Sequence, residues 1–577
     1  MRRLLHYLKR HPVITVLAPL FKMLEATFEL FVPVVVARMI DVGIAGKDKV
    51  YLFKMGGLLV LLGVAGLAFS VTAQYFAAKS AVRTGQAIRS DLFAHINTLS
   101  YREIDGVGTS TLINRMTGDI NQVQSGLNMF LRLFLRSPFV VFGCMVMAFV
   151  VGKRAALPFA VVIPALLLVV FAILLFSMPL YRGVQKRLDR VLLDTRENLL
   201  GIRVVRAFSR QKEEKKAFRF ESENLYRRQI FVGKISALLN PLTYVIVNLG
   251  VVAILYTGGR QVDAGTLTQG QVIALVNYMT QILTELVKLA NLMILLSRAL
   301  ASLSRVNAVF DMKASIPEEG AELRVTTASP VPAVSFDHVG FVFAGEREET
   351  LHDISFEALP GQTIGIIGGT GSGKSTLAQL IPRFYEASSG QISLYGQDIR
   401  TLRPSSVRGH IGVVPQKATA FSGTLLSNMR WRKKDADEAE IYRALDTAQA
   451  REFVESKGEG LSLRIEQGGG NLSGGQKQRL TIARALVGDP EILILDDSAS
   501  ALDFATDERL RRAIREQSDG KTVFIISQRV SAIRNADRIL VLHEGHLVGQ
   551  GTHEELISSC DIYREICDSQ AVGKEAG

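Results

Sequence analysis

The residues from Gly368 to Thr376 have the types and the spacing that bind the phosphate groups of a nucleotide. A glycine is followed after four residues by Gly-Lys-Ser, and the stretch follows an apolar strand and opens a helix, as in a Walker A loop. Glycines let backbone N–H groups turn toward phosphate oxygens, and the start of the helix adds positive potential. Lys374 is expected to reach the β- and γ-phosphates, and Ser375 is expected to bind Mg²⁺. The alternative is an ordinary glycine-rich turn, which would not require a strand before it and a helix after it. The predicted phosphate-binding residues are Gly368, Gly369, Thr370, Gly371, Ser372, Gly373, Lys374, Ser375 and Thr376.

A carboxylate for the same ion is expected at Asp496, which ends the apolar run Ile492–Leu495. An Asp in this place, after a buried strand and downstream of a Walker A loop, binds Mg²⁺ directly or through water. An Asp that merely caps a helix is the alternative, and the apolar strand before it argues against that reading.

A third motif identifies a family. The run Asn471-Leu472-Ser473-Gly474-Gly475-Gln476 resembles the ABC transporter signature, and over essentially its whole length the chain resembles an ABC exporter half-transporter. This resemblance implies ATP and Mg²⁺ as cofactors, with Gln416 joining Ser375 and Asp496 as a ligand of the ion. It also implies that Phe343 stacks on adenine, although an aromatic residue near a strand is usually part of the core. The D-loop of the family corresponds to Ser500, Ala501, Leu502 and Asp503.

Two residues depart from the family pattern at the catalytic centre. Asp497 stands directly after the Walker B strand, where the family carries Glu, and Gln528 stands where the family carries His. Asp is one methylene shorter than Glu and so draws its carboxylate away from the attacking water. Gln can donate a hydrogen bond to the γ-phosphate but cannot carry positive charge. The sequence therefore predicts a site that binds ATP well and hydrolyses it poorly.

The intact signature predicts a second subunit. In the family, each ATP lies between the Walker motifs of one chain and the signature of another, so a complete signature is useful only if the opposite site is competent. We therefore expect a bacterial heterodimeric exporter in which a second half-transporter supplies Glu and His. A slow homodimer, or an ATP-gated channel or sensor, is the alternative. The transported substrate stays open between drugs, lipids and peptides.

The N-terminal half must cross a membrane. Of the chain's 577 residues, 48% are hydrophobic, and the long apolar stretches lie before about residue 305. Each is long enough for a hydrocarbon core of roughly 30 Å. Six spans are predicted at Val13–Val36, Met55–Ala78, Leu133–Gly152, Ala155–Leu180, Ile235–Tyr256 and Val272–Leu296. The net charge of +12 concentrates near the first span and between the fourth and fifth, which indicates cytoplasmic termini in a bacterial plasma membrane rather than a nucleic-acid partner.

The predicted fold is a membrane domain of six helices with long cytoplasmic extensions, fused to an α/β P-loop nucleotide-binding domain. Its expected boundaries are a membrane domain at 1–305 with transverse coupling helices near 99–106 and 198–205, a linker at 306–333, the nucleotide-binding domain at 334–566 and a tail at 567–577. The short β-branched runs Thr363–Ile367, Ile411–Val414, Ile492–Leu495 and Thr522–Ile526 indicate a largely parallel sheet.

Four charged residues inside the predicted spans are candidates to line a substrate path or to pair across helices. Glu25 and Glu29 are spaced i, i+4 in the first span, one turn after Lys22, and Glu285 and Lys288 form an i, i+3 pair in the sixth. Charges at membrane depth are costly and face a cavity or each other. The spacing favours a structural pair for Glu285 with Lys288, and a cavity role for Glu25 and Glu29.

Overall fold

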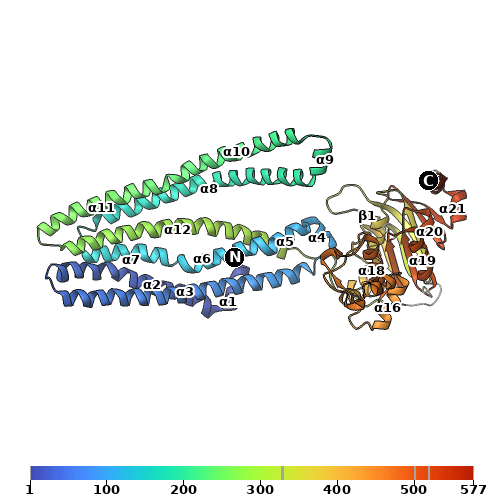
Figure 1. Cartoon of the computed structure of the whole chain (residues 1–577), viewed down its shortest axis with the longest axis horizontal. Helices are drawn as coiled ribbons and strands as arrows, with labels where there is room; N and C mark the ends of the chain where they lie inside the picture. Colours follow the sequence, from blue (N-terminus) through green and yellow to red (C-terminus); the bar gives the residue numbers. More distant parts are fainter. Residues whose placement is uncertain (1, 326–330, 499–501, 517–519, 576–577) are drawn as a thin grey trace. The chain divides into compact units, whose positions relative to one another are not determined.

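The computed structural model describes residues 2–325, 331–498, 502–516 and 520–575, which form two compact units. The first unit comprises the chain up to Ala94 together with Ser110–Asp311, and the second comprises His95–Thr109 together with the chain from Met312 onward. Figure 1 shows a long helical unit and an α/β unit. Each unit is described separately.

The first unit is entirely helical. Its α-helices are α1 (Arg2–Lys9), α2 (Pro12–Arg38), α3 (Lys49–Ile96), α5 (Thr109–Asn114), α6 (Ile120–Leu133), α7 (Arg136–Val151), α8 (Leu157–Leu200), α9 (Ile202–Ala207), α10 (Gln211–Ala237), α11 (Leu239–Asp263) and α12 (Gln269–Phe310), with π-helical turns η1 (Met39–Ile44) and η2 (Arg115–Asp119). Helix α3 alone has 48 residues. At a rise of about 1.5 Å per residue it is about 70 Å long, roughly twice the thickness of a hydrocarbon core. Helix α3 is therefore long enough to continue well beyond a bilayer, as the predicted extensions require.

Among the described residues, five helical stretches are long and apolar enough to cross a membrane: Lys49–Ile96, Thr109–Val151, Leu157–Leu200, Gln211–Asp263 and Gln269–Phe310. They coincide, to within two residues at one end, with the second to the sixth predicted spans or enclose them. The first predicted span lies in α2, which has 27 residues but carries Lys22, Glu25 and Glu29 in its apolar part, and it is not one of the five. A count of six spans is not confirmed by these five.

Helix α12 is the centre of the unit and packs against α2, α6, α7, α8 and α11. Its side chains in this core are mostly aliphatic, and the buried Tyr278 hydroxyl donates to the Leu30 carbonyl of α2 at 2.7 Å. Gly126 of α6 lets that helix approach α12 closely, because a Cβ atom at this position would lie 2.2 Å from the Ala299 Cβ. A larger residue at 126 would separate the two helices.

Two short helices lie where the long helices reverse, near the predicted coupling helices. Helix α9 joins α8 to α10, which lie side by side in Figure 1. No residue of α9 is buried, and its apolar side chains Ile202 and Val204 are exposed. Helix α4 (Tyr101–Val107) begins with a capping box between Ser100 and Glu103.

Helix α4 packs within the second unit, although the sequence places it in the membrane domain. The Ser100 hydroxyl accepts a hydrogen bond from the Ile316 amide at 3.0 Å, and the Tyr385 hydroxyl donates to the Asp105 carboxylate. The Tyr101 ring lies 4.8 Å from the Phe384 ring. An element between two membrane helices is thus tied to the nucleotide-binding fold.

The second unit is built on one large sheet with the order β5-β4-β1-β2-β12-β11-β3-β10-β9-β6. Its strands are β1 (Val334–Phe341), β2 (Leu351–Ala358), β3 (Thr363–Gly368), β4 (Ser389–Leu394), β5 (Gln397–Asp398), β6 (Ile411–Val414), β9 (Ile492–Asp496), β10 (Thr522–Ile526), β11 (Arg538–His543) and β12 (His546–Gly551), and β7 (Gly423–Thr424) pairs with β8 (Arg464–Ile465). Strands β6, β9, β10 and β3 are parallel, as predicted, and β11, which was not predicted, extends this parallel part beside β3. The other half, β1, β2, β4 and β5, is antiparallel, which the sequence did not predict.

The remaining α-helices described in this unit are α13 (Lys374–Leu380), α14 (Pro404–Gly409), α15 (Leu425–Met429), α16 (Glu438–Thr447), α17 (Arg451–Ser456), α18 (Gly474–Leu486), α19 (Phe504–Glu516), α20 (Val530–Ile533), α21 (His553–Ser559) and α22 (Asp561–Glu575). Helix α22 continues to Glu575, within the stretch that was predicted to be a tail, and α12 continues to Phe310, into the predicted linker. Every residue of β9 is buried, as in a strand covered on both faces.

Candidate functional site

The predicted phosphate-binding residues meet at one edge of the sheet because three parallel strands end there. Asp496 ends β9 and pairs in register with Ile526 of β10, which pairs in turn with Ile366 of β3. The carboxyl ends of β3, β9 and β10 therefore lie side by side, which is where α/β proteins bind ligands. They enclose a cavity of about 280 Å³ lined by Thr350, Thr370, Gly371, Ser372, Gly373, Lys374, Ser375, Thr376, Gln416, Asp496, Asp497, Ile526, Ser527 and Gln528.

The loop between β3 and α13 has the backbone that only glycine adopts readily. Gly371 and Gly373 have φ angles of 82° and 91°, in the left-handed region. A Cβ atom at Gly373 would also lie 2.5 Å from the Leu351 side chain. These two glycines turn successive N–H groups to one side, which makes a concave site for an anion.

Lys374 lies beneath this loop. Its Nζ donates to the carbonyls of Gly368 and Gly369, and burial lowers the pKa of the ammonium, against the opposing effect of Asp496 and Asp497. A phosphate group would replace these neutral carbonyls with charged oxygens, which bind an ammonium group more strongly. Lys374 is therefore placed to bind a polyphosphate.

Ser375 and Asp496 are in contact, as shared ligands of one ion require. The Ser375 hydroxyl donates to the Asp496 carboxylate at 3.1 Å. Burial raises the pKa of Asp496, and the neighbouring Asp497 carboxylate adds to this rise, while Ser375 and Lys374 oppose it. A carboxylate in this setting gains by binding a cation. Mg²⁺ fits these oxygen ligands, since it is commonly held by one or two carboxylates and by substrate phosphates.

Asp497 and Gln528 line the same cavity as the phosphate loop. The Asp497 amide donates to the Ile526 carbonyl at 3.0 Å, and its φ of 44° is left-handed. Asp and Asn tolerate this backbone better than longer side chains do. The two residues that depart from the family pattern thus lie beside the groups predicted to bind phosphate and Mg²⁺.

Not every predicted nucleotide ligand lies at this cavity. Among the residues that the structure describes, Gly368, Gly369 and Phe343 are not part of the lining. The Phe343 ring packs edge-on against Phe341 and Tyr385, with ring centroids 4.8 Å and 5.4 Å apart. Thr350, Ile526 and Ser527 line the cavity but were not predicted, because they belong to no phosphate-binding pattern.

Phe343 is only partly buried, and its adenine-stacking role stays a prediction with a direct test. Replacing Phe343 by Ala is expected to weaken ATP and ADP binding equally, by about tenfold, since stacking on a base contributes about 1–3 kcal/mol. Phe343→Tyr keeps the ring and serves as the control. Equilibrium binding of both nucleotides measures the effect, and unchanged affinities in Phe343→Ala would show that the ring belongs to the core alone.

The signature residues lie elsewhere in the unit. Ser473 caps α18: its hydroxyl accepts from the Gln476 amide at 3.3 Å, and its own amide donates to the Gln476 side chain at 3.0 Å. The first amides of this 13-residue helix have no partner within the helix, as suits a phosphate group. In the part of the chain that the structure describes, no residue from Asn471 to Gln476 lines the cavity around Lys374. Of the D-loop, Ser500 and Ala501 lie outside the described residues, while Leu502 is buried and Asp503 exposed.

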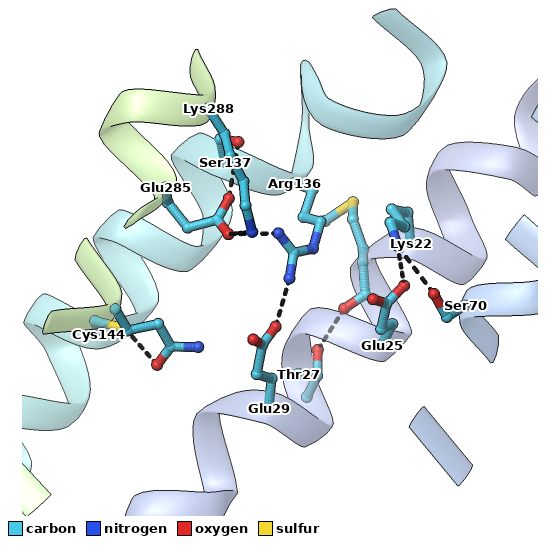
Figure 2. A network of polar contacts seen from close by, with 12 residues as sticks. Lys22, Glu25, Thr27, Glu29, Ser70, Arg136, Ser137, Cys144, Glu285 and Lys288 are labelled. Carbon is cyan, nitrogen blue, oxygen red and sulfur yellow. Dashed lines mark hydrogen bonds and ion pairs between the residues drawn. The ribbon is translucent and has the colours of Figure 1, made fainter. Parts of the chain in front are cut away.

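The charged residues of the membrane helices form a polar network (Figure 2). The Arg136 guanidinium lies between two carboxylates, 2.5 Å from Glu285 of α12 and 2.5 Å from Glu29 of α2. Glu285 also pairs with Lys288 at 2.8 Å, as predicted, and accepts from the Ser137 hydroxyl at 2.9 Å. Arg136 thus joins α2, α7 and α12.

Glu25 pairs with Lys22 of the same helix, and Lys22 also donates to Ser70 of α3 at 3.2 Å. Both glutamates for which the sequence favoured a cavity role therefore have cationic partners. Arg136 was not predicted to take part. The signal that could have found it is a single arginine inside the predicted third span, where an unpaired cation is costly.

Comparison with known proteins matches both parts of the chain to ABC transporter families. Residues 15–286 match the family "ABC transporter transmembrane region", and residues 351–500 match the family "ABC transporter". An uncharacterised ABC transporter ATP-binding protein of Bacillus subtilis (strain 168), YfiB, is 35% identical over 571 residues, which cover 99% of this chain and 98% of that protein.

Two further relatives cover the whole chain. The ATP-dependent lipid A-core flippase of Chromobacterium violaceum is 30% identical over 570 residues, covering 98% of this chain and 96% of the flippase. The solved structure of a bacterial Atm1-family ABC exporter with ATP bound superposes with a TM-score of 0.81, at 25% identity and 98% coverage of both chains. The membrane helices, the phosphate-binding cavity and these full-length relatives together place the chain in the ABC transporter family, as an ATP-driven exporter with a membrane domain fused to its nucleotide-binding domain.

Proposed function

We propose that this chain is one subunit of a heterodimeric exporter, that it holds ATP at a slow site of its own, and that its signature completes the fast site of its partner. One observation carries the proposal: Asp497 and Gln528 line the same cavity as a complete phosphate loop. The groups that would bind ATP are therefore present, and the two that would drive its hydrolysis are altered.

The chemistry of the two altered residues supports slow hydrolysis. A general base must lie within about 2.6–3.2 Å of the water that it activates, and the Asp497 side chain is one methylene shorter than Glu. A donor that faces developing negative charge works best when it is positive, and the Gln528 amide is neutral. Backbone amides, Lys374 and the pair Ser375–Asp496 do not depend on either residue, so binding of Mg²⁺ and ATP is expected to survive.

The separate position of the signature supports a second chain. Residues 471–476 lie outside the cavity that holds Lys374, and Ser473 stands at the start of a helix whose first amides can bind a γ-phosphate. A partner that carries Glu and His would use this signature for rapid hydrolysis. The alternative is a homodimer with two slow sites.

For the membrane part we propose six crossings, with α2 as the first and both termini in the cytoplasm of a bacterial cell. The pairing of Glu29 with Arg136 and of Glu25 with Lys22 offsets the charges that distinguish α2 from the other five stretches. Closure of two nucleotide-binding units around ATP would move α4, which packs against the nucleotide-binding fold, and so convert an inward-facing cavity to an outward-facing one.

The substrate class that we propose is a lipid-like amphiphile. The full-length relative that is an ATP-dependent lipid A-core flippase supports a lipid over a drug or a peptide. Glu29 and Lys288 would be the polar contacts, because their side chains are 42% and 43% exposed while Glu285 is buried.

Transport is tested in inside-out vesicles that contain the chain and its partner. We expect a fluorescent phospholipid to accumulate against its gradient when ATP is added. Lys374→Ala in this chain is expected to reduce that accumulation strongly, because closure around ATP at this site is lost. An ATP-gated channel would instead pass ions or lipid without accumulation, and that result would contradict the exporter.

Subunit composition is tested by native mass spectrometry of the complex purified from its own membranes. We expect one copy of this chain and one copy of a second half-transporter whose sequence carries Glu and His at the two altered positions. Two copies of this chain and no second polypeptide would contradict the heterodimer.

A further inference from the structure

The last helix of the chain reaches the loop that carries Gln528. The Gln570 side chain of α22 donates from Nε2 to the Gln528 carbonyl at 2.7 Å, and its Oε1 accepts from the Val530 amide at 2.9 Å. One amide therefore bridges the backbone on both sides of Arg529. A carbonyl and an N–H group are matched by a donor and an acceptor, so the orientation of the Gln570 amide is fixed by its partners.

Helix α22 is a firm support for this contact because its inner face is packed. Tyr563 is fully buried and its hydroxyl lies 2.8 Å from the His553 ring nitrogen Nδ1. Ile566 of α22 packs in the same cluster as Ile533 of α20, the short helix that follows residues 527–529, the loop that carries Gln528 and is named the switch loop. Gln570 thus extends from a helix that is already held against the element beyond Gln528.

The position of the Gln528 side chain depends on this backbone. Gln528 leaves the sheet two residues after the end of β10 and lines the nucleotide cavity. A side-chain donor must lie within about 2.7–3.2 Å of its acceptor, so a shift of the loop by 1 Å removes the bond to a γ-phosphate oxygen. A contact that holds the backbone of this loop would therefore also hold the Gln528 side chain in place.

We propose that Gln570 is a positioning residue for Gln528: by bonding the switch-loop backbone from α22, it holds the Gln528 amide toward the γ-phosphate of ATP. This inference rests on the proposed role of Gln528 at the same site. It makes the end of the chain part of the nucleotide site, although Gln570 itself does not line the cavity among the residues described.

The test compares ATP with ADP, because only ATP has the phosphate that Gln528 would bind. Full-length protein in lipid nanodiscs is titrated with Mg-ATP and Mg-ADP at low temperature, where hydrolysis is slow. Gln570→Ala is expected to weaken ATP binding about two- to tenfold, the size of one hydrogen bond, and to leave ADP binding unchanged. Gln570→Glu keeps the acceptor for the Val530 amide but loses the donor for the Gln528 carbonyl. It is also expected to lower the affinity for ATP relative to that for ADP.

Ser569→Ala is the matched control, since the exposed Ser569 hydroxyl donates to the Ile566 carbonyl of its own helix and reaches no residue of the switch loop among those described. Gln528→Ala is the second reference and is expected to show the same loss of ATP preference. Adding Gln570→Ala to Gln528→Ala is then expected to change nothing further, because the side chain to be positioned is absent.

Three results overturn the inference. The first is an unchanged preference for ATP over ADP in Gln570→Ala when Gln528→Ala has lost that preference. This result leaves the role of Gln528 intact. An equal loss for ATP and ADP, or losses that add in the double variant, shows that Gln570 only stabilises the fold. A normal ATP preference in Gln528→Ala removes the proposed role of Gln528 and the inference with it.

Discussion

Replacing Asp497 by Glu and Gln528 by His together is expected to raise ATP turnover at this chain's own site on the order of a hundredfold, the cost of a misplacement of roughly 1 Å at a reacting centre. The longer carboxylate reaches the attacking water, and an imidazolium can face the charge that develops on the γ-phosphate. Each single variant is expected to recover part of the gain. The measurement is steady-state phosphate release by protein in nanodiscs.

Two controls locate the gain. Lys374→Ala in the restored background is expected to abolish it, which shows that the new turnover arises at this cavity. Asp497→Asn in the original background is expected to change little, because the base is already poorly placed. Glu adopts the left-handed backbone at position 497 less readily than Asp does. This lowers the stability of the variant by a free energy on the order of 1 kcal/mol, so thermal melting is followed in parallel. Turnover of several ATP per second by the unaltered chain alone would contradict the impaired site.

Replacing Arg136 by Met is expected to destabilise the membrane unit by about 3–5 kcal/mol, which corresponds to a fall in melting temperature of roughly 5–10 °C. The Glu285 side chain is only 2% exposed. Without Arg136 it keeps Lys288 and Ser137 but loses its buried cation. Glu29 of α2 also loses its ion pair with Arg136 in this variant.

Melting of the membrane unit can be followed through Cys144, a buried thiol in α7, after Cys560 and Cys567 are replaced by Ser. A thiol-reactive dye then reports the temperature at which this helix opens. Arg136→Met combined with Glu285→Gln is expected to be more stable than Arg136→Met alone, because the buried carboxylate that has lost Arg136 is then neutral. Arg227→Met is the matched control: Arg227 forms an exposed pair with Glu223, worth about 0–1 kcal/mol. Equal melting of the Arg136 and Arg227 variants would show that the network contributes nothing.

The phosphate site was predictable because its signals are local. A strand, a glycine loop and a helix follow one another at Gly368, and Asp496 ends a wholly apolar run. Parallel pairing of β3, β10 and β9 then brings these segments together without further information. The antiparallel half of the sheet was missed because an alternating pattern, such as that of Val334–Phe341, does not give the partner or the direction of a strand; β1 pairs with β2 and with β4 on its two sides.

Contacts that join distant residues were the hardest to predict. Arg136 binds Glu29 and Glu285, which are 107 and 149 positions away, and nothing near Arg136 in the sequence names either partner. Gln570 is a similar case, because its partners lie 42 and 40 residues earlier. The same limit applies to Phe343, whose pattern indicates adenine stacking but gives no sign of its contact with Tyr385.

Helix α9 has a consequence for the life of the protein in the cell. It connects the far ends of α8 and α10, which form a long arm. The apolar side chains of Val204 in α9 and of Phe208, directly after α9, are exposed, and Phe208 is 74% exposed. Patches of this kind adhere to one another and to chaperones unless something covers them. A cell that synthesises this polypeptide in excess of whatever covers the arm would therefore face its aggregation or proteolytic removal, so balanced synthesis becomes a condition for accumulation.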